Sequence, residues 1–128
     1  MKHQLKLEII QRNIFDITPY ANNPRINKDS VDSLVEAITN FGFLVPIILD
    51  NNNVIVTGHT RLLAAKKIGL KEVPCINAEH LTESQIKQFR LVDNKIAEMS
   101  SWDIDKLGGE ISETAELGID FKGFKGFR

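Results

Sequence analysis

The chain has 128 residues, of which 42% are hydrophobic and 26% are charged, and its formal net charge is −1. These values match one average soluble domain. The absence of any block of five or more basic residues argues against a protein that coats DNA by itself. No apolar run approaches the ~20 residues that span a bilayer. The single cysteine, Cys75, fits a reducing compartment, so we expect a cytoplasmic protein.

The first predicted elements are a strand, a loop and a helix. Residues 4–10 alternate loosely between polar and apolar types and predict a strand. Residues 18–27 are rich in Pro and Asn, which predicts a loop. Asn27 can cap a helix that Gly42 ends. Its apolar residues recur at helical spacing and predict one buried face: Val31, Leu34, Val35, Ile38 and Phe41.

A hairpin, a second helix and another strand follow. Residues 47–49 and 54–56 are apolar runs around an Asp/Asn cluster, which predicts a hairpin. Thr57 and Gly58 lead into a helix over residues 60–68. Residues 73–76 predict a strand, and its Pro74 indicates a sheet edge or a strand start.

The last predicted elements are two helices. Thr82 and Gln85 form a capping box, and Asp103 can cap the final helix. The buried face of the first is predicted from its apolar spacing: Ile86, Phe89, Val92, Ile96 and Met99. We expect Trp102 to pack the final helix against the body. Together these elements predict one α/β domain over residues 1–118, in which helices flank a small mixed sheet. Residues 119–128 are expected to form a frayed tail.

The segment from Thr57 to Arg61 has the composition of an anion site. Gly58 between a strand and a helix lets a ligand approach the backbone. The first helical turn presents free N–H groups, Thr60 adds a hydroxyl, and Arg61 adds a planar cation. His59 could contact phosphate or act as a general acid or base. An ordinary turn with a solvated Arg61 fits the spacing equally well.

Two other segments could complete the same site. Arg25, in the predicted loop, could bring a second guanidinium to the anion. On the long helix, Arg90, Asp93 and Asn94 share a stripe with Ala97 beside the buried face. Such a stripe can face a cleft, although the stripe alone favours a set of local helical pairs that face water.

The order of four motifs resembles the N-terminal domain of the ParB/sulfiredoxin superfamily. The motifs are Asn23-Pro24-Arg25, residues 42–47 (Gly-Phe-Leu-Val-Pro-Ile), Gly58-x-x-Arg61-x-x-Ala64-Ala65 and Val73-Pro74. The chain looks most similar to ParB-like domains of phage, plasmid and methyltransferase-associated proteins. These share its Gly58-His59-Thr60-Arg61, its Asp93-Asn94 followed by a basic residue, and its Trp102-Asp103.

The resemblance implies that Gly58 and Arg61 hold the phosphates of a nucleotide. With the chemistry of the neighbouring side chains, we expect CTP or ATP to be bound by Gly58, His59, Thr60, Arg61 and Arg25. The resemblance also implies that Asn94 contacts phosphate and Mg²⁺, and that the segment before the turn holds the base. The residues expected on the base side are Phe43, Leu44 and Pro46.

The chain also departs from relatives in the superfamily. Sulfiredoxins carry a catalytic cysteine directly after the glycine, where this chain has His59, and Cys75 is expected in the core. Sulfiredoxin activity is therefore not expected. Chromosome-partitioning proteins usually carry Glu-Arg-Arg after the glycine, which is His59-Thr60-Arg61 here. We also expect no counterpart of the helix-turn-helix of those proteins within these residues.

These observations give three hypotheses. The first is a nucleotide-binding module of DNA metabolism that reaches DNA through a partner protein and forms a nucleotide-dependent homodimer. The second is an enzyme, either a weak NTPase, a nucleotide-dependent kinase or a metal-dependent nuclease, with His59 and Asp93 as candidate catalytic residues. The third is a protein-interaction module that has lost the ligand.

Overall fold

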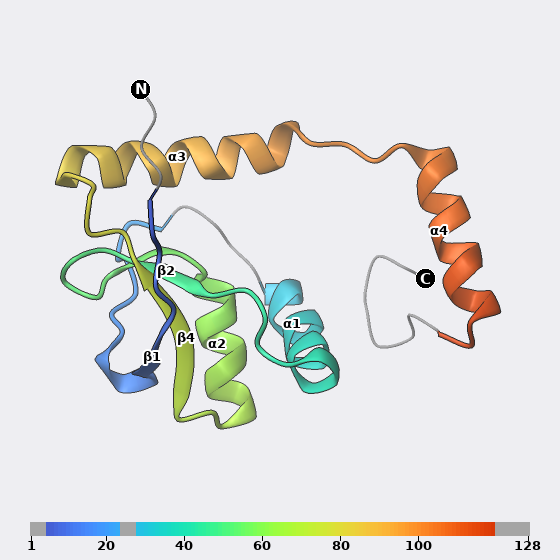
Figure 1. Cartoon of the computed structure of the whole chain (residues 1–128), viewed down its shortest axis with the longest axis horizontal. Helices are drawn as coiled ribbons and strands as arrows, with labels where there is room; N and C mark the ends of the chain where they lie inside the picture. Colours follow the sequence, from blue (N-terminus) through green and yellow to red (C-terminus); the bar gives the residue numbers. More distant parts are fainter. Residues whose placement is uncertain (1–4, 24–27, 120–128) are drawn as a thin grey trace.

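A computed structural model describes residues 5–23 and 28–119. In chain order the elements are β1 (Ile10–Asn13), the 3-10 turn η1 (Ile14–Asp16), α1 (Lys28–Phe41), β2 (Ile47–Leu49), β3 (Ile55–Thr57), α2 (His59–Ile68), β4 (Glu72–Asn77), α3 (Glu83–Met99) and α4 (Ile104–Glu116). Figure 1 shows the sheet between α2 below and α3 above, with α4 away from this body. In the described part of the chain, no helix is both long and apolar enough to cross a membrane.

The sheet is mixed, as the sequence predicts. Its strand order is β1-β4-β2-β3. The β1–β4 and β2–β3 pairs are antiparallel, and the β2–β4 pair is parallel. The hairpin turn between β2 and β3 is held by the Asp50 carboxylate, which accepts hydrogen bonds from the N–H groups of Asn52 (2.8 Å) and Val54 (2.9 Å).

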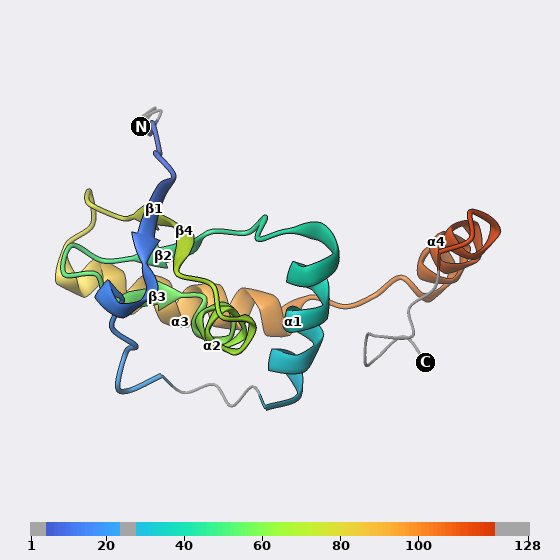
Figure 2. The ribbon, with the colours of Figure 1, turned by 90° about the horizontal axis from the view of Figure 1, so that it is seen from below.

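Alternation along the strands gives the sheet two buried faces. Ile47, Leu49 and Ile55 point to the face that α2 covers through Leu62 and Ala65. On the other face, Ile48 and Val56 pack with Ile86 of α3. Cys75 lies in the first of these clusters and is fully buried, as expected. Figure 2 shows α1 beside α2, and Lys67 of α2 pairs with Asp32 of α1 at 2.6 Å.

The predicted first strand, residues 4–10, is wrong in position. Pairing with β4 begins at Ile10 and runs to Asn13. The ladder continues where the Ile14 N–H donates to the Lys71 carbonyl at 3.0 Å, and Ile14 is buried in the core. Residues 5–9 alternate in sequence but pair with no strand in the described part of the chain. The alternation of polar and apolar residues therefore marks the segment just before β1 and not β1 itself.

Pro74 does not mark an edge strand, because β4 lies between β1 and β2. The pairing of β4 with β2 begins only at Cys75, one residue after the proline. Pro74 lies opposite Gln11 of β1. At Pro74, β4 therefore has a single neighbouring strand, which explains how the sheet tolerates a residue without an N–H.

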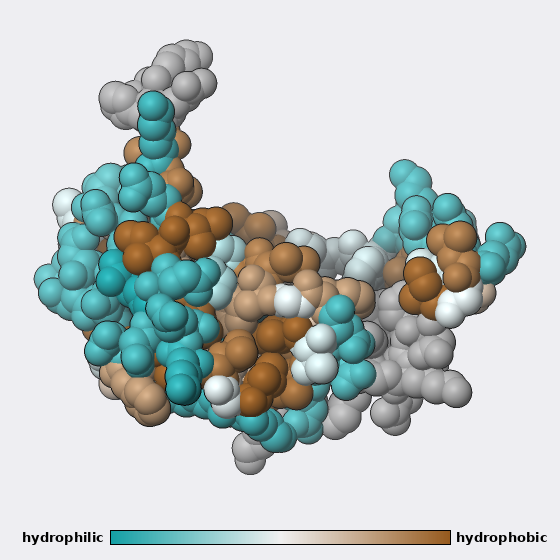
Figure 3. Space-filling view, turned by 60° about the horizontal axis from the view of Figure 1, so that its bottom comes forward, coloured by the Kyte–Doolittle hydropathy of each residue, from teal (hydrophilic) through white to brown (hydrophobic). Residues whose placement is uncertain are grey.

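The C-terminal part of α3 extends beyond the body. The capping box of Thr82 and Gln85 starts the helix as predicted, and Ile86 is buried. The predicted buried face is wrong farther on, because the helix outruns the sheet: Val92, Ile96 and Met99 are 46%, 59% and 73% exposed. Figure 3 shows apolar side chains gathered over the middle of one face and a further patch on α4.

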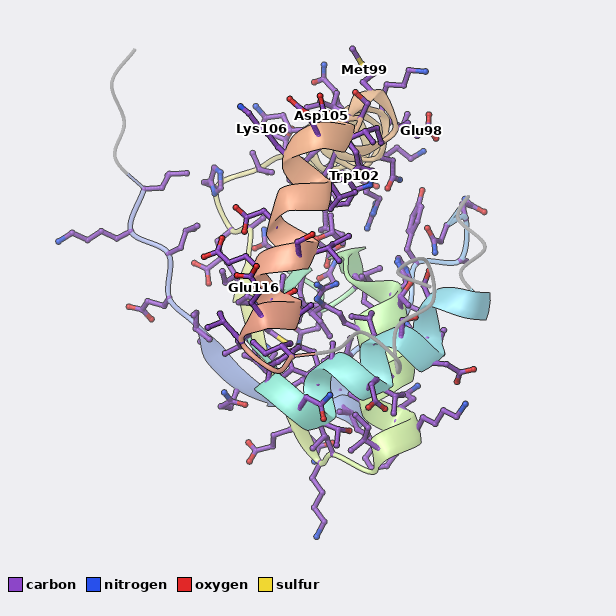
Figure 4. The ribbon with its side chains drawn as sticks, turned by 90° about the vertical axis from the view of Figure 1, so that its right-hand side faces the viewer. Glu98, Met99, Trp102, Asp105, Lys106 and Glu116 are labelled. Atoms are coloured by element: carbon purple, nitrogen blue, oxygen red, sulfur yellow. The ribbon has the colours of Figure 1, made fainter. Side chains whose placement is uncertain are left out.

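The final helix starts at its predicted cap. The Asp103 side chain accepts a hydrogen bond from the Lys106 N–H. However, α4 has no buried residue, and Trp102 is 68% exposed. The expectation that Trp102 packs α4 against the body is therefore wrong. Figure 4 shows Met99 at the end of α3 and Trp102 in the connection between α3 and α4. Residues 120–128 of the predicted tail, and the predicted cap Asn27, lie outside the described residues.

Candidate functional site

The turn between β3 and α2 requires a glycine. Gly58 has φ of +110°, a backbone conformation that other residues rarely adopt. A Cβ at this position would lie 3.2 Å from Cγ1 and 3.3 Å from Cα of Ile47 on β2. Gly58 therefore allows the start of α2 to lie directly against the sheet.

The first turn of α2 offers backbone donors to an anion. The helix begins at His59, and its first intrahelical bond joins the Leu62 N–H to the Gly58 carbonyl at 3.1 Å. The N–H groups of the three residues before Leu62 consequently have no helical acceptor. No acidic side chain lies in this turn, so the positive end of the helix dipole is not neutralised there.

Arg61 places a guanidinium beside these donors. Its side chain is half-buried, and desolvation lowers its pKa from the usual range of an arginine. Among the residues that the structure describes, the guanidinium has no hydrogen bond or ion pair. A partly desolvated cation without a carboxylate partner is suited to an anionic ligand.

His59 is held as a neutral imidazole. Its Nε2 accepts a hydrogen bond from the Tyr20 N–H at 3.0 Å, so the ring proton belongs on Nδ1. Burial lowers the pKa of His59, and the positive charge of Arg90 lowers it further. The ring can then donate from Nδ1 but does not carry a full positive charge at neutral pH.

Arg90 is a structural cation behind the site. It is 8% exposed, and its Nε and one terminal nitrogen donate to the Ile55 carbonyl at 3.3 and 2.9 Å. Its guanidinium also stacks on the Tyr20 ring at 3.7 Å. Arg90 thus joins α3, β3 and the loop at Tyr20. The sequence pattern indicated that Arg90 could lie near a cleft. It did not indicate a role for Tyr20, because Tyr20 contacts His59 through its backbone N–H and not through its side chain.

Most of the predicted site residues line one pocket, which has a volume of about 120 Å³. It is lined by Asn23, Val56, Thr57, Gly58, His59, Thr60, Arg61, Asp93 and Asn94. Asp93 and Asn94 reach it from α3, so these two members of the predicted stripe line a pocket, whereas Ala97 does not. Arg25, the second predicted guanidinium, lies outside the described residues.

Two hollows adjoin this pocket. One shares Arg61 with it and has a volume of about 180 Å³. Phe43 and Leu44 line this hollow, whereas Pro46 is not among its lining residues. The other shares Asn23, Val56 and Asn94 with the pocket and has a volume of about 280 Å³; Tyr20, Asn22 and Lys87 also line it.

The pocket contains few groups that could hold a metal ion. Within residues 5–23 and 28–119, no cluster of three or more His, Cys, Asp or Glu side chains has the arrangement of a metal site. Asp93 and Asn94 supply oxygen donors at the pocket. This set fits Mg²⁺, which is commonly held by one or two protein groups together with substrate phosphates.

Cys75 is not a nucleophile of this site. Burial raises the pKa of its thiol, an effect that the positive charge of Arg12 partly offsets. It lies in β4 and is absent from the lining of the pocket. The residue after Gly58 is a histidine, so this turn carries no thiol.

The sequence matches the model of the ParB N-terminal domain over residues 2–95. YnaK, a ParB-like nuclease domain-containing protein of Escherichia coli strain K12, is 37% identical over 81 residues, which cover 62% of this chain and 93% of YnaK. A probable chromosome-partitioning protein ParB of Rickettsia felis is 38% identical over 93 residues, which cover 70% of this chain. This chain covers 32% of that longer relative.

Solved structures share the fold. The C-terminally truncated ParB of Caulobacter crescentus, complexed with CTP-gamma-S, has a TM-score of 0.72 at 20% identity and covers 87% of this chain and 64% of its own. Sulfiredoxin of Arabidopsis thaliana has a TM-score of 0.54 at 20% identity, covering 64% of this chain and 96% of its own. A free serine kinase with AMP has a TM-score of 0.52 at 20% identity, covering 62% of this chain and 34% of its own. The match to the family model over most of the chain shows that it belongs to the ParB N-terminal domain family.

Proposed function

We propose that the chain binds the phosphates of CTP or ATP, with Mg²⁺, in the pocket at the Gly58 turn. The observation that carries the proposal is the half-buried Arg61 guanidinium, which has no partner in the described structure and stands beside the free N–H groups of α2. Arg61 neutralises phosphate charge, while the backbone from Gly58 to Thr60 donates hydrogen bonds. We assign the same role to Arg25.

The neutral state of His59 suits this role. Nδ1–H donates to a phosphate oxygen while Nε2 stays bound to the Tyr20 N–H. Asn94 orients a phosphate or the Mg²⁺ ion from the α3 side of the pocket, and Asp93 adds a carboxylate that a bound Mg²⁺ would compensate. Two structural neighbours, in complexes with CTP-gamma-S and with AMP, support a nucleotide as the ligand.

The base has two hollows available. The family resemblance implies that the base lies on the side of Phe43, Leu44 and Pro46. The hollow beyond Arg61, which Phe43 and Leu44 line, supports this choice because its apolar side chains can stack against a base. The hollow at Tyr20 and Asn22 also offers an amide that can read the edge of a base. Separate Phe43→Ala and Asn22→Ala variants decide between them, because only the variant on the base side changes the preference between CTP and ATP.

Calorimetric titration tests the phosphate assignment. Wild-type protein is titrated with CTP and with ATP in the presence of Mg²⁺, and we expect saturable binding of one of them. Arg61→Ala should weaken binding by about tenfold or more, since a hydrogen bond to a charged group contributes ~1.5–3 kcal/mol. Lys66→Ala, at the exposed end of the same helix, is the matched control and should bind like wild type. Equal affinities in Arg61→Ala and wild type would refute the assignment.

We propose that the module works in DNA metabolism, in the cytoplasm, and reaches DNA through a partner protein. The family membership and the partitioning relatives support this, whereas the low net charge argues against direct coating of DNA.

An enzymatic role is the second candidate, and the presence of Asp93 in the pocket is the observation that favours it. Under this alternative, protein with Mg²⁺ releases phosphate from a nucleotide or cuts DNA over many turnovers. Both Asp93→Ala and Arg61→Ala should abolish that turnover. Purified protein with neither activity would leave binding as the function.

A further inference from the structure

The segment before β1, residues 5–9, stands clear of the folded body. Figure 2 shows it running away from the sheet, and Figure 3 shows the same segment projecting from the surface. Leu5, Leu7 and Ile9 are 54%, 55% and 62% exposed. Three large apolar side chains in one short segment are therefore left to solvent, and the backbone of residues 5–9 pairs with no described strand.

The sequence of this segment is complementary to itself. In an extended chain, Leu5, Leu7 and Ile9 share one face, and Lys6 and Glu8 share the other. If two copies lie antiparallel with Leu7 opposite Leu7, then Lys6 of each copy faces Glu8 of the other. Leu5 then faces Ile9, so apolar residues meet on one face and opposite charges meet on the other.

No neighbouring register has this property. A shift that places Lys6 opposite Lys6, or Glu8 opposite Glu8, brings like charges together, which destabilises a strand pair. A shift by a single residue sets apolar side chains opposite charged ones. A parallel pair in register also sets like charges side by side. Lys6 and Glu8 have no ion-pair partner among the described residues, so both are available to a second copy.

We propose that two copies of this chain pair through residues 5–9 as antiparallel strands related by a twofold axis at Leu7. The pairing supplies partners for the backbone N–H and C=O groups of the segment and brings together the exposed apolar row of each copy. The segment leads directly into β1, an edge strand of the sheet, so the paired segments prolong an existing element. The interface is separate from the pocket at Gly58 and needs no nucleotide.

Oxidative crosslinking tests the register, with the full chain in the absence of nucleotide. In the proposed pair, the Cα atoms of Leu7 in the two copies are about 4.5–5.5 Å apart, within the reach of a disulfide. Leu7→Cys should therefore form a covalent dimer. In Leu5→Cys the two positions are about 14 Å apart along the strands, so this control should not crosslink. The native Cys75 is buried and does not compete.

Charge exchange tests the pairing without oxidation. Sedimentation over a range of protein concentrations should show a monomer–dimer equilibrium in wild type that weakens as salt is added. Lys6→Glu and Glu8→Lys should each weaken dimerisation by about tenfold, because each creates two like-charge pairs. The double variant restores the opposite charges and should dimerise like wild type. Equal crosslinking of both cysteine variants, or a double variant no better than the single ones, would overturn the proposal, as would a wild type that stays monomeric at all concentrations.

Discussion

Gly58 is the residue on which the geometry of the candidate site depends most. It combines a positive φ with a close approach to Ile47, so a side chain would be strained in its backbone and crowded by β2. Gly69, at the other end of α2, also has a positive φ, but a Cβ there would meet nothing within 4 Å. A comparison of substitutions at these two glycines can therefore distinguish the cost of backbone strain, which both share, from the cost of the steric contact, which only Gly58 has.

We predict that Gly58→Ala destabilises the protein more than Gly69→Ala. Left-handed backbone costs about 1–2 kcal/mol for a non-glycine residue, and only Gly58→Ala adds the contact with Ile47. Urea unfolding measures the free energy of unfolding of both variants. Gly58→Ala should also lose nucleotide binding, whereas Gly69→Ala should keep it. Equal destabilisation by the two substitutions would show that the approach to Ile47 has no energetic consequence.

His59 gives a prediction about pH. Burial and Arg90 lower its pKa below the usual 6.5, so folding favours the neutral ring. The unfolded chain then binds more protons than the folded chain between the lower folded pKa and 6.5. The contribution to stability is full above about pH 6.5 and is lost as the pH falls through that window.

NMR titration of the His59 ring protons measures the pKa directly, and urea unfolding across the same pH range measures its effect on stability. His59→Gln removes the titration, so its stability should change less than that of wild type as the pH falls. In Arg90→Gln the pKa of His59 should rise, yet stay below 6.5, because burial is the larger cause. A wild-type pKa at or above 6.5 would contradict the assignment of a neutral ring.

At the scale of the elements, α3 has two different halves. Its first half is packed on the sheet through Ile86, and its second half carries exposed apolar residues. Ile86→Ala should cost about 2–5 kcal/mol. Ile96→Ser, on the same predicted face, should change the free energy of unfolding by no more than about 0.5 kcal/mol. Thermal or urea unfolding of the two variants checks this, and a comparable loss in both would mean that the second half is buried.

This difference shows what the sequence could predict. Helical spacing identified the apolar face of α3, and Thr82 identified its start, because both signals are local. How far the helix extends past the sheet depends on where the sheet lies against it, which the helical spacing does not contain. The first strand was misplaced for a similar reason. Alternation in residues 5–9 is genuine, but β4 pairs with the following residues.

The candidate site follows the same rule. The glycine at position 58 was predictable because a turn between a strand and a helix gives it a local physical reason. The role proposed for Arg61 needed the family resemblance as well, because an ordinary turn with a solvated Arg61 fits the spacing equally well. Asp93 and Asn94 are distant from this turn in the sequence. The stripe on the helix indicated that they could face a cleft, and the family resemblance implied that Asn94 contacts phosphate. The contact of the Tyr20 backbone with His59 was not foreseen, because it crosses 39 positions of the sequence without a side-chain signal.

At the scale of the whole molecule, the pocket and the exposed apolar surface share one helix. Asn94 lies at the pocket, and Ile96, Met99 and Trp102 follow it toward α4. We propose that nucleotide occupancy shifts the end of α3 and α4, and that a second copy then covers this surface. This association requires nucleotide, unlike the pairing of residues 5–9.

Sedimentation with and without CTP or ATP and Mg²⁺ tests the idea. A protein that carries Lys6→Glu, which weakens the pairing of residues 5–9, should still associate when nucleotide is added. Adding Trp102→Ala should abolish that association while nucleotide binding is retained. Nucleotide-dependent association that survives Trp102→Ala would place the interface elsewhere.

The most direct test of the central claim is to locate the ligand on the protein by NMR. Backbone amide signals are followed as CTP or ATP, with Mg²⁺, is added, and cytidine or adenosine serves as the control without phosphates. We predict saturable shifts of the His59, Thr60 and Arg61 amides that the nucleoside does not reproduce. Unchanged signals at this turn, or shifts confined to other surfaces, would contradict a phosphate site at Gly58.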